Sequence, residues 1–122
     1  MDVFNPYLSA RTLDVLSNYS GKEINILTSI DNLRPQDKSQ FIREYKDFKK
    51  ENSKIEIKDY SSSELHDRYI LSKNFLIILG HGIKDLGNRD SFAIVLDKKV
   101  STNIIESLTE VFDRRWKQST SL

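Results

Sequence analysis

The sequence contains no cysteine, only two histidines and no long run of apolar residues. Without cysteine, a disulfide framework and thiolate chemistry are excluded, and two histidines alone do not make a structural zinc site. No stretch approaches the roughly 20 apolar residues that a membrane-spanning helix needs. The start of the chain is polar and mixed, so no signal peptide is visible. We therefore expect a soluble, cytoplasmic protein without a metal or a cofactor.

An excess of charge of one sign is also missing, because 19 Lys and Arg residues are balanced by 18 Asp and Glu residues. This balance argues against a highly basic nucleic-acid-binding protein, although it is compatible with a local basic patch. A chain of 122 residues is long enough for one hydrophobic core and too short for two. We expect a single domain over residues 1–122, which could be excised from a longer protein.

Helical and strand periodicities alternate along the chain. Apolar residues recur at helical spacing, and thereby predict helices, over 10–19, 35–52 and 103–117. Alternating β-formers predict strands over 23–29, 54–60 and 91–96. The order of the elements predicts an α/β fold in which helices flank a mixed β-sheet, with parallel strands in its first half.

The ends of these elements carry their own signals. Residues 2–7 are predicted to be an entry strand or a loop, and Pro6 would confine such a strand to an edge of the sheet or to its start. In the last helix, Ile104 is expected to face the core, and Ser101 or Thr102 is the expected cap after a turn over 97–100. The tail after Gln118 is predicted to be frayed.

Both histidines and three of the four glycines lie in the stretch from Ser63 to Phe92. It predicts a β-hairpin with strands over 65–71 and 75–80 and a turn at Ser72-Lys73-Asn74. If Leu71 pairs with Phe75, then His66 lies opposite Gly80. Alternation along the strand would then put His66 and Arg68 on the same face.

That end of the hairpin has the composition of a phosphate site. An imidazole lies two residues from a guanidinium and faces a glycine, which leaves room for a ligand. His66 is the candidate nucleophile if there is catalysis, and His81 is a weaker candidate for a general acid. The candidates for phosphate binding contribute positive charge or accessible backbone N–H groups, and they are Arg68, Gly80, Gly82, Lys84 and Arg89.

Each of these residues also has an ordinary structural explanation. His66 could be an inert polar residue at the start of a strand, and His81 a simple loop residue. Arg68 could pair with Asp67 or Glu64 on the surface, a contact worth at most about 1 kcal/mol. The glycines could serve only as turn residues. A basic rim formed by Arg89, Arg114, Arg115 and Lys117 could equally serve solubility.

The stretch resembles a degenerate form of the signature of the phospholipase D superfamily, H-x-K-x4-D-x6-G-[SG]-x-N. His66 matches the histidine, Arg68 takes the place of the lysine, and Gly80 matches the glycine. Lys73 stands at the aspartate position and Ile83 at the asparagine position. In active members the histidine forms a phospho-histidine intermediate, and the lysine and asparagine bind phosphate oxygens. The resemblance therefore implies one half of a phospholipase D-like fold.

The HDR form of the motif is also similar to two less characterised groups. One is the phospholipase D-like C-terminal domain of proteins that begin with a microtubule-interacting-and-trafficking domain, which is thought to bind acidic membranes without catalysis. The other is a set of bacterial and phage proteins with a G-x-x-x-K-D-L-G segment. Active members combine two histidine motifs, so a single motif implies either a homodimer that shares one site or a module that has lost catalysis.

Three classes of function follow. The first is a phosphate-recognising module with little or no turnover, whose ligand is an acidic phospholipid or a nucleic-acid backbone. The second is a phospholipase D-type nuclease or phosphodiesterase that acts as a homodimer through His66. The third is a protein-interaction domain that retains only the fold. The replacement of the orienting aspartate and asparagine favours the first and third classes.

Overall fold

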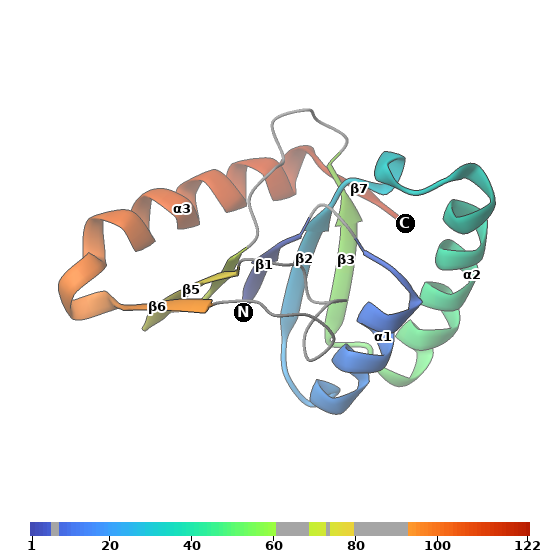
Figure 1. The fold of residues 1–122 in the computed structure, drawn as a ribbon, viewed down its shortest axis with the longest axis horizontal. Coiled ribbons are helices and arrows are strands. Elements are labelled where there is room, and N and C mark those ends of the chain that lie inside the picture. Colours follow the sequence, from blue (N-terminus) through green and yellow to red (C-terminus); the bar gives the residue numbers. More distant parts are fainter. Residues whose placement is uncertain (6–7, 61–68, 73, 80–92) are drawn as a thin grey trace.

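In the computed structural model, a mixed α/β domain is described over residues 1–5, 8–60, 69–72, 74–79 and 93–122. Three α-helices accompany the sheet, namely α1 (Ala10–Leu16), α2 (Pro35–Glu51) and α3 (Lys98–Gln118) (Figure 1). Short 3₁₀ turns follow α1 at Ser17–Tyr19 and precede α2 at Ile30–Asn32. The strands are β1 (Asp2–Phe4), β2 (Ile24–Thr28), β3 (Ile55–Asp59), β4 (Tyr69–Leu71), β5 (Phe75–Leu79), β6 (Ala93–Asp97) and β7 (Thr120–Ser121).

These strands form one seven-stranded mixed sheet in the order β6-β5-β4-β1-β2-β3-β7. The three strands β1, β2 and β3 run parallel, whereas β4, β5, β6 and β7 each pair antiparallel with their neighbours. The predicted parallel first half and mixed sheet are therefore confirmed. An entry strand, one of the two predicted alternatives for residues 2–7, does form. It lies inside the sheet and ends at Phe4, before Pro6, so the predicted restriction to an edge or to the start of a strand does not apply to it.

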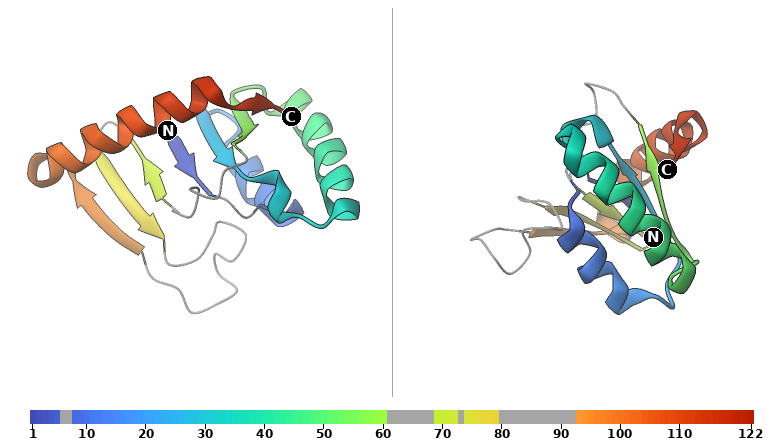
Figure 2. Two further views of the ribbon diagram at one scale, coloured as in Figure 1. Left: turned by 90° about the horizontal axis from the view of Figure 1, so that it is seen from above. Right: turned by 90° about the vertical axis from the view of Figure 1, so that its right-hand side faces the viewer.

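Helices cover both faces of the sheet, so the domain has three layers (Figure 2). On one face, α1 and α2 pack Leu13, Leu16 and Phe41 against the inward side chains of the parallel strands. On the other face, α3 packs Ile105 and Phe112 against a second cluster that includes Phe4, Leu27, Tyr69, Leu71 and Leu76. Alternation along the strands explains the two clusters, since neighbours such as Val3 and Phe4 point to opposite faces.

The described part of the predicted hairpin, Tyr69–Leu71 paired with Phe75–Leu79, forms, but its register differs by one residue from the expected one. Leu71 pairs with Leu76 and not with Phe75, and Ser72 donates its backbone N–H to the Phe75 carbonyl at 3.0 Å. The physical reason is burial: Leu76 is fully buried on the face that Leu71 also occupies, and a shift of one residue would turn it outward. The pairing of His66 with Gly80 was inferred from the wrong register, and both residues lie outside the described part of the chain.

The start of α3 and the tail that follows it differ from the sequence-based expectation, whereas the helix ends within one residue of the predicted position. Asp97 is the N-cap, because its carboxylate accepts the Lys99 N–H at 2.7 Å, and the helix begins where a turn was expected. Ser101 has non-helical dihedral angles and separates this first turn from the rest of the helix, so a helix break does occur at one of the two positions predicted for the cap. Ile104 was expected to face the core but is half exposed. The tail was expected to be frayed, yet Thr120–Ser121 pairs with Lys58 and Asp59 of β3.

One buried hydroxyl group supplements the pairing of β3. Tyr45, on α2, is 3% exposed, and its hydroxyl oxygen accepts the backbone N–H of Ile57 at 3.0 Å. The last strand, β7, pairs only with Lys58 and Asp59, so it does not reach Ile57. The tyrosine thus satisfies a strand N–H that would otherwise be buried without a partner.

Candidate functional site

Parallel strands end at the same edge of a sheet, and here the carboxyl ends of β1, β2 and β3 lead to Asn5, Ser29 and Tyr60. Strand β4 is antiparallel to β1, with Tyr69 opposite Phe4, so β4 begins at this same edge. The side of β1 on which successive strands are added also changes here. Strands β2 and β3 extend the sheet on one side of β1, whereas β4 extends it on the other. In open α/β sheets, ligands bind outside the carboxyl ends of strands at such a switch point.

Backbone and side-chain hydrogen bonds hold this edge together. The Asn5 N–H donates to the Leu27 carbonyl at 3.0 Å, and the Tyr60 N–H donates to the Thr28 carbonyl at 2.8 Å. One oxygen of Asp59 accepts the Ile30 N–H at 2.9 Å, which fixes the start of the chain toward α2. The polar residues Asn5, Thr28 and Ser29 are buried. The edge is therefore a polar, ordered platform next to β1.

An arginine from α3 lies over this platform. The Arg115 guanidinium carbon is 5.4 Å from the centre of the Phe4 ring and 5.5 Å from that of Tyr60. Its Nε is buried and has no hydrogen-bond partner among the described residues. The Phe4 ring in turn contacts Tyr69, with 4.5 Å between their centroids. The sequence had indicated Arg115 only as a member of a basic rim, because Phe4 and Tyr60 are too distant in sequence to reveal the contact.

The residues predicted to bind phosphate or to catalyse lie outside the described residues, and they are His66, Arg68, Gly80, His81, Gly82, Lys84 and Arg89. The structure does describe where the chain on either side of them joins the sheet. Tyr69 follows Arg68 directly, Leu79 precedes Gly80, and Ala93 is the first described residue after 80–92. Tyr69 pairs with Ile78, and Leu79 pairs with Ala93. All three attachment points thus lie at the edge where β1 ends.

The opposite, amino edge of the sheet carries charges of both signs, because Asp2 lies there near the N-terminal ammonium of Met1. Burial raises the pKa of Asp2 above its ordinary value of 3.8, and the nearby carboxylate of Asp113 acts in the same direction. The amide Nδ2 of Asn25 donates to Asp2 at 3.3 Å and partly opposes this shift.

We expect Asp2→Asn to raise the free energy of unfolding at pH 7. The folded state binds the Asp2 proton more tightly than the unfolded state does, so stability falls as the pH rises from 3.8 through the raised pKa. Asparagine keeps the oxygen that accepts from Asn25 and removes the charge. The gain should be at most about 1 kcal/mol, because the half-buried group is partly screened. Urea unfolding of both proteins should show a difference at pH 7 that disappears at pH 3, and an equal difference at both pH values would contradict this account.

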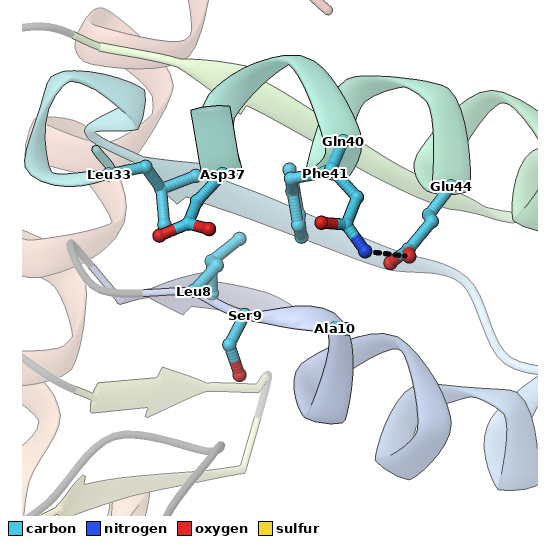
Figure 3. Close-up of a pocket in the computed structure, with 8 residues that line it drawn as sticks. All are labelled: Leu8, Ser9, Ala10, Leu33, Asp37, Gln40, Phe41 and Glu44. Carbon is cyan, nitrogen blue, oxygen red and sulfur yellow. Dashed lines mark hydrogen bonds between the residues drawn. The ribbon is translucent and has the colours of Figure 1, made fainter. Parts of the chain in front are cut away.

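A separate groove lies between α1 and α2 and has a different character (Figure 3). Its cavity of about 350 Å³ is lined by Leu8, Ser9, Ala10, Leu33, Asp37, Gln40, Phe41 and Glu44. Asp37 accepts from the Arg34 Nε at 2.7 Å, and Glu44 accepts from the Gln40 amide at 3.0 Å. Its two carboxylates make this groove unsuitable for a phosphate, so the edge next to β1 is the better candidate.

The described residues contain no group of three or more His, Cys, Asp or Glu side chains placed to hold a metal ion. No helix within the described ranges is long and apolar enough to cross a membrane. Comparison with models of protein families and with curated proteins finds no match to this chain. The residues of the sheet edge and the sequence motif are therefore the basis for the proposed function.

Proposed function

We propose that this chain is a phosphate-recognising module of the phospholipase D-like type, with little or no turnover. The observation that supports the proposal is the position of the attachment points Tyr69, Leu79 and Ala93 at the carboxyl edge of β1. The segments that carry His66, Arg68 and Gly80 join the sheet there, where the direction of chain progression changes. An αβα domain with a mixed sheet is compatible with one half of a phospholipase D-like fold.

The pattern of replacements in the motif favours binding over catalysis. Arg68 keeps the positive charge of the family lysine and can grip a phosphate with two hydrogen bonds. Lys73 and Ile83 replace the aspartate and the asparagine that orient the reacting centre in active relatives. Loss of oriented groups typically reduces rates by orders of magnitude, because positioning and electrostatic stabilisation contribute several kcal/mol to catalysis.

We expect Arg68→Ala to weaken binding of a phosphodiester ligand by about tenfold or more, since a hydrogen bond to a charged group contributes about 1.5–3 kcal/mol. His66→Ala should weaken binding less, because an imidazole carries less positive charge near pH 7 than a guanidinium, which is always protonated. The measurement is fluorescence titration with short DNA and RNA strands and with vesicles containing phosphatidic acid. Lys50→Ala is the matched control, since Lys50 lies on α2 in an exposed ion pair with Asp47.

The same preparations should be assayed for hydrolysis of a phosphodiester substrate. Very slow or absent cleavage is expected in the wild-type protein. Brisk cleavage that His66→Ala abolishes would favour the second class of function, a nuclease or phosphodiesterase, and light scattering would then be expected to show a homodimer. Absence of binding to every phosphate-bearing ligand would refute the proposal and leave the protein-interaction class.

A further inference from the structure

The groove between α1 and α2 extends along most of the length of α2. A second cavity, of about 470 Å³, adjoins the cavity of Figure 3, and both are lined by Ala10 and Glu44. The α2 residues that line the two cavities recur three or four positions apart from Asp37 to Glu51, so they form one stripe of about 21 Å along the helix. On α1, the side chain of Ala10 ends at Cβ, which leaves space between the two helices. We call the two cavities together the α1–α2 groove.

The α1–α2 groove has an apolar floor and acidic walls. Leu13 and Phe41 are buried at its floor, and Phe48 is partly buried beside them. Among the described residues that line it there is no Lys or Arg, whereas five are acidic, namely Asp14, Asp37, Glu44, Asp47 and Glu51. Arg34 and Lys50, outside the lining, form exposed ion pairs with two of these carboxylates. The groove therefore complements a surface that carries apolar side chains next to cations.

A surface of that composition lies at the start of α3. Of the large apolar side chains that the structure describes, Val100 is the most exposed, at 88%, and Ile104 is 50% exposed. Lys98 and Lys99 directly precede Val100 and are also exposed. Neither apolar side chain belongs to the two core clusters of the described chain. Packing within one domain thus leaves two apolar side chains and two cations together on the surface.

The α1–α2 groove and the start of α3 lie at opposite ends of the domain (Figures 1 and 2). A single chain therefore cannot bring its own α3 start into its own groove. We infer that the α1–α2 groove binds the start of α3 of a second copy of this chain. Val100 and Ile104 are the apolar anchors of this contact, and Lys98 and Lys99 are attracted to the carboxylates of the walls. The contact is separate from the phosphate site of the proposed function and does not depend on it.

This contact joins two different surfaces, so it is heterologous and does not close on itself by twofold symmetry. Each added copy leaves one free groove and one free α3 start, so further copies can add along the long axis of the domain. Two apolar anchors and a few charges make a small interface, for which we expect a dissociation constant on the order of 100 µM. Because the cations are exposed, association should weaken as NaCl is raised from about 50 to about 500 mM.

Two variants that each remove one side of the contact test the inference. Val100→Glu puts at the anchor a charge of the same sign as the groove walls, and Glu44→Lys puts a cation between the two cavities. Each variant alone should associate about tenfold more weakly, which leaves it largely monomeric at about 100 µM. A 1:1 mixture should form a complex of two chains, because the intact groove of Val100→Glu can bind the intact α3 start of Glu44→Lys. The controls, Gln118→Glu and Glu110→Lys, make the same charge changes at exposed positions further along α3 and should associate like the wild-type protein.

Sedimentation velocity from about 10 to about 500 µM gives the masses, and circular dichroism shows whether each variant is folded. A wild-type protein that stays monomeric throughout would refute the inference. The inference is also wrong if the wild-type protein stops at two chains and the mixed variants do not associate, since a twofold dimer behaves in that way. If Glu44→Lys reduces association and Val100→Glu does not, a different surface occupies the groove and the assignment to α3 fails. Phosphate binding is measured separately and decides only the proposed function.

Discussion

Replacement of Phe112 by alanine should lower the free energy of unfolding by about 3–5 kcal/mol, the range for large core aromatics. Phe112 is 2% exposed and joins α3 to the sheet. Its ring meets Phe4 edge-on at 5.0 Å between centroids and stacks on Trp116 at 5.7 Å. Alanine would remove both ring contacts and leave a cavity between the helix and the central strand.

Urea unfolding followed by circular dichroism measures this loss. The midpoint should fall while the dependence on urea stays the same, since the amount of surface exposed on unfolding changes little. Val100→Ala is the matched control, because Val100 lies on the same helix and is 88% exposed. A loss similar to that of this control would show that α3 does not depend on Phe112 for packing.

Tyr45→Phe should cost about 1–3 kcal/mol, although it removes a single oxygen atom. The hydroxyl accepts the N–H of Ile57 in a buried position, and phenylalanine would leave that N–H without a partner. The penalty is the desolvation of an unsatisfied backbone group, which exceeds the net value of an ordinary hydrogen bond.

Tyr19→Phe provides the comparison for this second variant, because Tyr19 is 51% exposed and should tolerate the change. Hydrogen exchange adds a local readout, since the Ile57 amide should lose protection in Tyr45→Phe. If stability and Ile57 protection both remain at the wild-type level, another group or a water molecule satisfies that N–H.

Periodicity predicted most of the fold because the apolar residues that recur at helical or strand spacing are the ones that folding buries. The helix over 35–52 and the strands over 23–29 and 54–60 agree with α2, β2 and β3 to within one residue at each end. The prediction of the hairpin register failed because Phe75 and Leu76 are both large and apolar. The sequence pattern alone does not show which of the two side chains is buried under α3. The tail was missed because a two-residue strand is determined by its partner β3, which is a tertiary effect.

The candidate site was only partly accessible to the same reasoning. A motif in one stretch of sequence pointed to His66 and Arg68, whereas the described residues of the sheet edge come from β1, β3 and α3. Arg115 has no local signature, since Phe4 and Tyr60 meet it only after the sheet and helix have packed. Sequence reasoning identifies residues that are grouped along the chain, whereas this cation belongs to a group formed by folding.

The central position of β1 has a consequence for the order in which the chain folds during synthesis. Residues up to Asp59 contain the three parallel strands and both helices of one face, so the ribosome can release a nearly complete α/β layer first. Until Tyr69–Leu71 has been made, the side of β1 that later pairs with β4 is an open strand edge with apolar Phe4 beside it. Such an edge is the surface that a chaperone or a second nascent chain would contact.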